Sequence, residues 1–261
     1  TAVVVIGRWS RENARVTDDN GVVHYEVPMI QVKSKMDDDP SRTYLQLTTE
    51  EEYMLKVVTE NFDNVIVLLN LCNTMELGFL DDYGIDAAMF IGTPGQSGAR
   101  AIPRLLYGQI TPSGKTADIY PYNHKADPTW ANACVDLSDR NNKYITYQEG
   151  MYYGYRWYET AFADGIQLTV NGIAQDFSTE EGYRKIVQFP FGFGLSYTQF
   201  AWELVEAPSG AINQATDSFT VKVKVTNTGN VAGKDVVEVY FQSEYTDYDR
   251  QNKIEKAAVE L

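Results

Sequence analysis

The sequence predicts an α/β fold with a mainly parallel sheet, followed by an antiparallel β region. Apolar β-branched runs such as Ala2–Ile6 do not alternate with polar residues, which is typical of strands buried on both faces of a parallel sheet. Helix-like segments separate these runs, and this order implies parallel strands joined by crossovers. Beyond the aromatic, glycine-rich stretch Phe189–Phe200, period-2 alternation takes over and indicates antiparallel strands with one exposed face.

Composition and charge limit the functions worth considering. The chain has 261 residues, 44% of them apolar, and a formal net charge of −14; its sequence pI is near 4.6. This negative charge argues against binding to nucleic acids and anionic membranes, which require basic surfaces. No apolar run approaches the roughly 20 residues that span a bilayer. We therefore expect a soluble chain, either cytoplasmic or secreted.

The cysteines and the chain ends carry less information. Cys72 and Cys134 fit no metal-ligand spacing and do not make a disulfide framework, and whether they pair stays open. Thr1 leads straight into a strand-like run without an opening Met, and Leu261 closes the chain in mid-pattern. We expect an internal slice of a longer protein.

The first predicted strand, Ala2–Ile6, ends at Gly7 and leads into the segment Arg8–Arg15. In a parallel α/β sheet, ligand-handling loops follow the carboxyl ends of strands. This segment holds a glutamate among tryptophan and arginine residues, so it is a candidate site. The polar stretch Val16–Ser41 is expected to be a long irregular loop.

A helix is predicted to begin at Thr48 or Thr49. Either threonine can cap free backbone amides, and the glutamate three residues further on completes a capping box in an acidic first turn that suits the helix dipole. We interpret these acids as structural. Met54, Val57 and Val58 are expected to form the buried stripe of the helix.

Two more buried strands are predicted, at Asn64–Leu69 and Asp86–Ile91, and the second runs into the glycine-rich turn Gly92–Gly98. Such a strand-to-helix turn can hold a phosphate on its amides, so a nucleotide site is one alternative. The spacing is G-x-x-G-x-x-G, Pro94 removes a donor and no Lys-Ser/Thr pair follows, which favours a packing turn. Pro103 is expected to shorten or kink the next helix.

Aromatic residues concentrate in two later stretches, beyond a short predicted strand at Thr116–Tyr120. Tyr144–Thr160 could line a sugar site, because pyranose CH faces stack on aromatic rings, or it could pack two domains together, which we favour. We interpret Phe189–Phe200 as the joint between two domains, since Gly192 and Gly194 permit backbone angles and close approaches that larger residues do not. An aromatic turn inside one core is the alternative.

Six segments in collinear order resemble the non-barrel part of glycoside hydrolase family 3, the β-glucosidase and β-xylosidase group: EEYMLKVV, NVIVLLN, PGQSGARA, YGQITPSGK, YQEGMYYGYRWYE and FPFGFGLSYTQF. The most specific is PFGFGLSYT after EG-x-x-x-GYR. The resemblance covers most of the chain. It implies a partial α/β sandwich domain over residues 1–188, followed over 189–261 by a linker and the start of a fibronectin type III-like domain.

The predicted fibronectin type III-like module rests on the pattern after residue 218. Phe219, Val221, Val223 and Val225 alternate with polar residues, and the run VVEVY at 236–240 follows a turn. This alternation predicts a half-buried antiparallel strand. A complete antiparallel β-sandwich of this type needs about 100 residues and seven strands, so we expect it to be truncated here.

The resemblance also implies a retaining glycosidase with an active site between this sandwich and a (β/α)8 barrel. Such an enzyme needs two carboxyl groups roughly 5 to 5.5 Å apart. The family's nucleophile is a barrel Asp with no counterpart here, and its acid/base is commonly a Glu in a G-R-x-S-G-E-G loop. Arg8, Ser10 and Glu12 match this pattern, whereas Arg11 and Asn13 replace glycines.

Glu12 is therefore our predicted general acid/base, with a solvated loop acid as the alternative. Its pKa must be raised so that it can donate a proton in one step and activate water in the other. Burial against Trp9 would help, while Arg8 and its neighbouring arginines would oppose the shift. Trp9 is also a candidate for stacking on a sugar, and Asp18 and Asp19 are fallback acids.

The implied protein is part of an exo-acting β-glucosidase that hydrolyses terminal β-D-glycosyl residues without a metal or cofactor. Its expected partners are a β-glucoside or oligosaccharide and the barrel part of the same enzyme, without which we expect no activity. A glycoside phosphorylase of the same family and a noncatalytic carbohydrate-binding or interaction module are the alternatives. Nucleic acid and membranes are not expected as partners, and homo-oligomer formation stays open.

Overall fold

The computed structural model describes residues 1–8, 13–17, 20–21, 23–28, 42–133, 149–209 and 218–261. These form two compact units, the first made of residues 1–94, 118–191 and 240–260, the second of residues 95–117, 192–239 and 261. The domain boundary predicted after residue 188 stays a prediction. In the first unit the elements are β1 (Ala2–Gly7), β2 (Asn13–Thr17), β3 (Val23–Pro28), α1 (Thr49–Asn61), β4 (Val65–Asn70), α2 (Phe79–Asp82), β5 (Ala87–Phe90), β6 (Tyr120–Pro121), a 3-10 helix (His124–Ala126), α5 (Trp130–Ala133), α6 (Tyr155–Ala163), β7 (Gln167–Val170), β8 (Ile173–Asp176), α7 (Glu180–Ile186), β9 (Val187–Phe189) and α8 (Asp247–Asn252).

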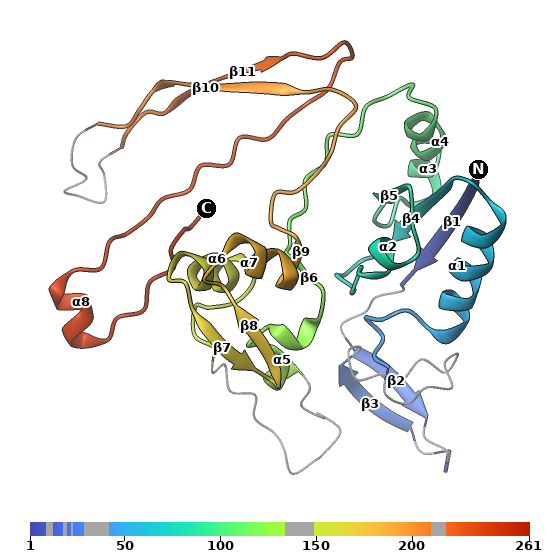
Figure 1. Ribbon diagram of the computed structural model, residues 1–261, viewed down its shortest axis with the longest axis horizontal. Helices are drawn as coiled ribbons and strands as arrows, with labels where there is room; N and C mark the ends of the chain where they lie inside the picture. Colours follow the sequence, from blue (N-terminus) through green and yellow to red (C-terminus); the bar gives the residue numbers. More distant parts are fainter. Residues whose placement is uncertain (9–12, 18–19, 22, 29–41, 134–148, 210–217) are drawn as a thin grey trace. The chain divides into compact units, whose positions relative to one another are not determined.

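The first unit contains a three-stranded parallel sheet in the order β1-β4-β5 (Figure 1). β1 pairs with β4 from Ala2↔Val65 to Gly7↔Asn70, and β4 pairs with β5 from Ile66↔Ala87. The three predicted strands and their parallel orientation are confirmed. The core beside the sheet contains the buried side chains Val4, Ile6, Leu55, Val65, Val67, Leu69 and Met75.

The sheet is less enclosed than the sequence predicted. Val4 and Ile6 are buried, but Val3 and Val5, which alternate with them, are 49% and 55% exposed, and Phe90 of β5 is 50% exposed. The expectation of strands buried on both faces is therefore wrong for β1 and β5. In β1, alternate side chains point to opposite faces, and only Val4 and Ile6 pack in the core. In the central strand β4, consecutive residues Val67, Leu68 and Leu69 are buried, whereas no residue of β5 is.

Helix α1 confirms the capping prediction and corrects the buried stripe. The Thr48 hydroxyl accepts from the Glu51 amide, and the Glu51 carboxylate accepts from the Thr48 amide, which completes the capping box. Leu55 is fully buried, whereas Val57 is 38% exposed. The stripe follows the spacing i, i+3, i+4, i+7, which places Glu51 on the same face as the core-facing side chains Met54, Leu55 and Val58.

Part of the predicted irregular loop is regular. β2 and β3 pair antiparallel, with Asn13 opposite Pro28 and Thr17 opposite Val23, and with a register shift between Ala14 and Val16. The loop prediction for residues 16–41 is therefore wrong at 16–17 and 23–28. The Val- and Tyr-containing run 23–27 is rich enough in β-formers to pair with the strand before it.

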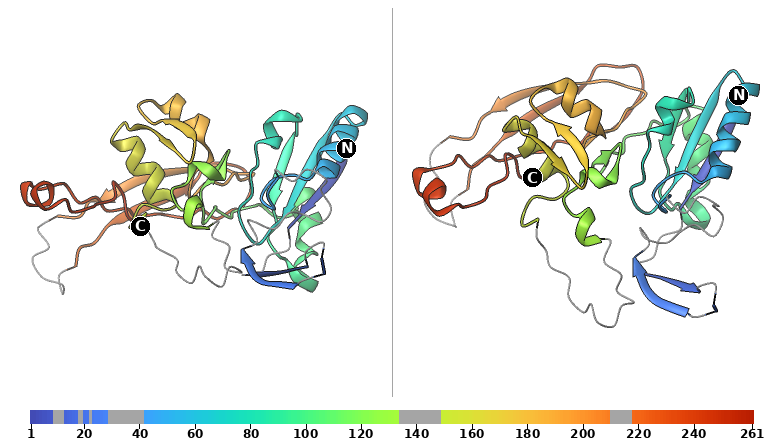
Figure 2. Two further views of the ribbon diagram at one scale, coloured as in Figure 1. Left: turned by 90° about the horizontal axis from the view of Figure 1, so that it is seen from below. Right: turned by 60° about the horizontal axis from the view of Figure 1, so that its bottom comes forward.

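A second core gathers around the aromatic helix α6. Tyr158 and Ala161 of this helix and Phe177 are fully buried, and Trp157 meets Phe177 edge to face. The neighbouring hairpin β7–β8, drawn in yellow in Figures 1 and 2, turns at Asn171-Gly172 with φ of 48° and 84°. Positive φ at both positions is the type I′ hairpin turn that Asn-Gly favours. Of the strand predicted at Thr116–Tyr120, only Tyr120 lies in a strand, in β6.

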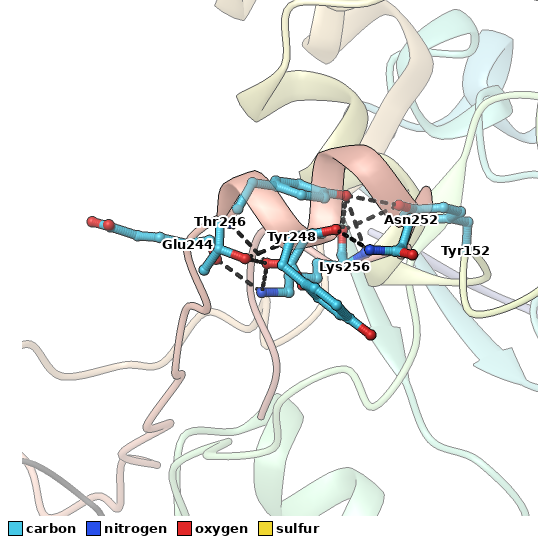
Figure 3. Close-up of polar contacts among 8 residues, drawn as sticks. Tyr152, Glu244, Thr246, Tyr248, Asn252 and Lys256 are labelled. Atoms are coloured by element: carbon cyan, nitrogen blue, oxygen red, sulfur yellow. Dashed lines mark hydrogen bonds and ion pairs between the residues drawn. The ribbon is translucent and has the colours of Figure 1, made fainter.

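Residues 240–260 return to α6 and carry α8. Phe241 and Glu260 form a β-bridge, the Thr160 hydroxyl accepts from the Ala258 amide at 2.9 Å, and Ala257 is buried. Figure 3 shows the polar contacts around α8. There the Lys256 ammonium donates to Asp249 at 2.6 Å, and the Tyr152 hydroxyl donates to the Lys256 carbonyl at 3.1 Å. This segment belongs to the first compact unit.

The second unit contains α3 (Gly95–Gly98), α4 (Ala101–Leu106), β10 (Phe200–Glu206) and β11 (Lys222–Asn227). α4 has only six residues and contains Pro103, as predicted for a shortened helix. Gly192 has φ of +75°, and a Cβ on Gly194 would collide with the Gly114 carbonyl oxygen. The predicted need for glycine at both positions is confirmed.

The antiparallel region is smaller than a sandwich. β10 and β11 pair antiparallel, with Trp202 opposite Val225 and Leu204 opposite Val223, which confirms the strand orientation. Val225 is 38% and Phe219 is 48% exposed, so the expected half-burial is wrong at these two positions. The run VVEVY at 236–240 is not a strand. Within the described residues this unit has a two-stranded ribbon, and a ribbon alone has no second sheet against which to bury a face.

Candidate functional site

The carboxyl edge of the parallel sheet is the place where this fold class handles ligands. Beyond β1, the Arg8 amide still donates to the Asn70 carbonyl at 3.1 Å, so the β1–β4 ladder continues one residue past the strand. At the end of β4, the Asn70 side-chain amide donates to the Gly92 carbonyl. These hydrogen bonds fix the ends of neighbouring strands at one edge.

Arg8 is the most constrained polar side chain at this edge. The residue is 7% exposed. Its Nη1 and Nη2 atoms donate to the two carboxylate oxygens of Glu51, each at 2.6 Å. The remaining donors reach the carbonyls of Gly7 (2.8 Å), Tyr44 (2.9 Å) and Gln46 (2.7 Å). A guanidinium has five N–H donors, and all five have an acceptor here.

Glu51 thus has two functions, of which the sequence predicted only the capping box. It closes the capping box of α1 and it neutralises Arg8, 43 positions away in the chain. The signal that could have found this pair is the position of Glu51 on the apolar stripe, because an acid facing the core needs a partner. The pairing also changes the electrostatic argument for Glu12, since the charge of Arg8 is compensated locally.

A second polar network connects the same edge to the 3-10 helix. Glu76 accepts from the Gln46 side-chain amide and from the His124 backbone amide, each at 2.9 Å, and His124 Nδ1 lies 3.7 Å from the carboxylate. Burial by itself would raise the pKa of Glu76, but the hydrogen bonds from His124 and Gln46 hold that pKa below its usual value. Glu76 is therefore a fixed negative charge at neutral pH rather than a proton donor.

An open pocket of about 530 Å³ lies beside this network. Its lining includes Gln46 and Glu76. Arg42 and Glu52, which form an ion pair at 2.8 Å, and the ring of Tyr83 also line it. The pocket is open, and its lining combines charged and aromatic side chains.

The predicted catalytic and sugar-stacking residues, Glu12 and Trp9, lie outside the described residues, and so do the fallback acids Asp18 and Asp19. What the structure describes is the residue that precedes this loop, Arg8, and the strand that leads into it. The assignment of the loop stays a prediction.

Two alternatives receive no support from the geometry. The glycine-rich turn leads into α3 and α4, which have four and six residues, so it offers no long helix for a phosphate. In the aromatic stretch, Tyr158 and Trp157 pack in the second core. These two side chains therefore pack in a core within the first unit, and the predicted role of the stretch between two domains stays a prediction.

In the described part of the chain, no three His, Cys, Asp or Glu side chains gather in a way that could hold a metal ion. Cys72 is an exposed free thiol, and Cys134 lies outside the described residues. None of the described helices has the length and apolar character needed to cross a membrane.

The fold is that of an α/β protein with a parallel sheet, and comparison with known proteins gives the family. Residues 1–155 match the glycosyl hydrolase family 3 C-terminal domain. The chain is 32% identical over 200 residues to a beta-glucosidase of Ruminococcus albus, covering 76% of this chain and 17% of that protein. It is 29% identical over 259 residues to beta-glucosidase A of Butyrivibrio fibrisolvens, covering 93% of this chain and 28% of that protein.

Among solved structures, the chain is similar to a beta-glucosidase from Paenibacillus barengoltzii. The TM-score is 0.66 at 29% identity, and the match covers 98% of this chain and 22% of that one. The chain belongs to glycoside hydrolase family 3. It spans less than a third of the length of each of these relatives.

Proposed function

We propose that this chain is part of a retaining, exo-acting β-glucosidase and that Glu12 is its general acid/base. The observation that carries the proposal is the position of Arg8 in a family member: it is the first residue beyond β1, held at the carboxyl edge, and Glu12 follows four residues later in the sequence. Four residues span at most about 14 Å when fully extended, which limits how far from this edge the backbone of Glu12 can lie.

The chemistry requires a second carboxylate that this chain is not proposed to supply. In a retaining mechanism one carboxylate attacks the anomeric carbon while the other protonates the leaving oxygen and later activates water. We assign the attacking Asp to a (β/α)8 barrel in the complete protein, and Trp9 to stacking on the sugar. On this proposal the isolated chain hydrolyses nothing, and turnover requires the barrel.

The pairing of Arg8 with Glu51 weakens one electrostatic argument against Glu12 as the acid. An unpaired guanidinium close to a carboxyl group lowers its pKa. Because Arg8 is already paired with both oxygens of Glu51, its charge opposes proton retention by Glu12 far less than the sequence suggested. The ionised Glu76, by contrast, has the wrong protonation state for an acid.

The test uses the complete protein with Glu12→Ala and two aryl β-glucosides, one with a poor leaving group (phenol) and one with a good one (2,4-dinitrophenol). Loss of general acid catalysis costs about 10²- to 10⁴-fold. We expect this loss in kcat/KM for the phenyl glucoside and a much smaller loss for the dinitrophenyl glucoside, with azide restoring turnover of the latter by replacing water. Glu60→Gln, on the exposed end of α1, is the matched control and should leave both rates unchanged.

Other outcomes separate the alternatives. Unchanged turnover of both substrates by Glu12→Ala would remove the assignment and direct attention to Asp18 or Asp19, or to a noncatalytic role for the chain. A requirement for inorganic phosphate would identify a phosphorylase. We expect turnover to be independent of phosphate.

A further inference from the structure

We propose that Arg8 is a positioning residue for the acid/base loop and that Glu51 is its obligatory partner. This inference rests on the proposed function of Glu12. Arg8 is the first residue after the end of β1. Its guanidinium is buried, and each of its N–H groups has a hydrogen-bond acceptor.

The hydrogen bonds of Arg8 join three separate segments. They reach the end of β1 through Gly7, the segment before α1 through Tyr44 and Gln46, and the first turn of α1 through Glu51. The guanidinium also lies over the Tyr44 ring, 5.7 Å from its centroid. A single side chain therefore fixes the strand end against the helix that covers the sheet.

Stability alone is a poor explanation for this arrangement. A buried ion pair contributes little net stability compared with apolar residues of the same size, because both charges lose their hydration. What such a pair provides is geometry. The bidentate fork between Arg8 and Glu51 defines both a distance and a plane, which a lysine in the same place could not do.

Arg8 fixes the backbone at the end of β1, directly before the segment that contains Glu12. Arg8 is held by its side chain and also by its amide, which donates to Asn70, so both the position and the direction of the chain are determined at the start of the loop. Displacement of a catalytic group by about 1 Å can cost roughly 10²-fold in rate. A loosened strand end would therefore lower the efficiency of Glu12 without removing its carboxyl group.

The experiment compares Arg8→Lys and Glu51→Gln with Glu12→Ala in the complete protein, on the phenyl and dinitrophenyl glucosides. Glu51→Gln removes the charge while glutamine can still close a capping box, so it keeps α1 intact if Arg8→Lys folds poorly. Glu50→Gln is the matched control, because Glu50 is an exposed acid in the same first turn. We expect Arg8→Lys and Glu51→Gln to lose about 10²-fold in kcat/KM on the phenyl glucoside, several-fold or less on the dinitrophenyl glucoside, and Glu50→Gln to lose nothing on either.

A purely structural role gives a different pattern. Loss of folded enzyme would lower kcat/KM for both glucosides by the same factor. If Arg8→Lys and Glu51→Gln show this equal loss while Glu12→Ala affects mainly the phenyl glucoside, the positioning inference is wrong and the proposed function of Glu12 stands. If Glu12→Ala does not discriminate, the proposed function fails and the inference fails with it.

Discussion

Two helix starts in the first unit use the same local motif for different ends. At α1, Thr48 and Glu51 form a capping box, and at α8, Thr246 and Asp249 form another. In each, the acid also binds a cation, Arg8 at 2.6 Å or Lys256 at 2.6 Å. Arg8 lies 43 positions from its acid, whereas Lys256 lies seven positions from its own.

This difference in separation decides what each pair can do. The lysine closes a local loop around α8, where it also donates to the Glu244 carbonyl at 2.9 Å (Figure 3). The arginine joins a strand end to a helix from another part of the chain. A point charge suits the first task, and a planar fork with five donors suits the second. A capping box is thus a local device that joins distant segments only when its acid pairs with a residue far away in the chain.

The largest expected effect comes from Arg8→Met. Removing one partner of a buried pair leaves an uncompensated charge and costs about 3–5 kcal/mol. We expect this loss as faster hydrogen exchange in β1 and the first turn of α1 of the complete protein. Arg184→Met removes an exposed i,i+4 pair with Glu180 and should change nothing measurable. Equal effects of the two variants would refute the anchor role of Arg8.

Glu76→Ala is expected to cause the second-largest loss of stability. It leaves the His124 amide and the Gln46 side chain without an acceptor, at a cost of about 1–3 kcal/mol. Hydrogen exchange of the 3-10 helix His124–Ala126 measures the loss. The same substitution at the exposed Glu60 serves as the control, and an unchanged exchange rate at His124 would contradict the network.

The two caps compare directly through Thr48→Ala and Thr246→Ala. Each loss of a cap costs about 1 kcal/mol. In α1, which has 13 residues, we expect fraying of the first turn only, because Arg8 still holds Glu51 against β1. The six-residue α8 should open throughout, because Lys256 holds Asp249 only to its own local segment. Amide exchange along both helices distinguishes these results. Thr59→Ala, within α1, is the control, and opening of all of α1 by Thr48→Ala would show that Arg8 does not hold the helix.

The smallest expected effect is the pH dependence of α8 stability that comes from Asp249. Hydrogen bonds from Lys256 and Thr246 lower the pKa of this carboxyl to about 2. Since the folded pKa lies below the unfolded value of about 3.9, the stabilisation is complete above pH 4 and is lost as the pH falls towards 2. Protection factors of the α8 amides should fall in this window in the native protein and lose this dependence in Asp249→Asn. A flat profile in the native protein would contradict the assignment.

Local sequence patterns predicted the helices, strands and caps well, but they predicted the burial of individual side chains less well. The β1, β4 and β5 strands, the α1 capping box and the glycines at 192 and 194 follow from neighbouring residues and were predictable. The Asn171-Gly172 hairpin had an equally clear local signal that the prediction passed over. The exposure of Val3, Val5 and Val57 had none, because burial depends on which elements cover a face.

The sequence by itself determined the α/β class, the parallel order of three strands, the family and the loop motif that nominates Glu12. It could do so because capping, strand propensity and turn chemistry act within a few residues. Only the tertiary structure decided that Arg8 binds Glu51, that Glu76 stays ionised and that residues 240–260 return to α6. These depend on contacts between residues far apart in the chain, whose electrostatic and packing energies exist only once the topology has brought them together.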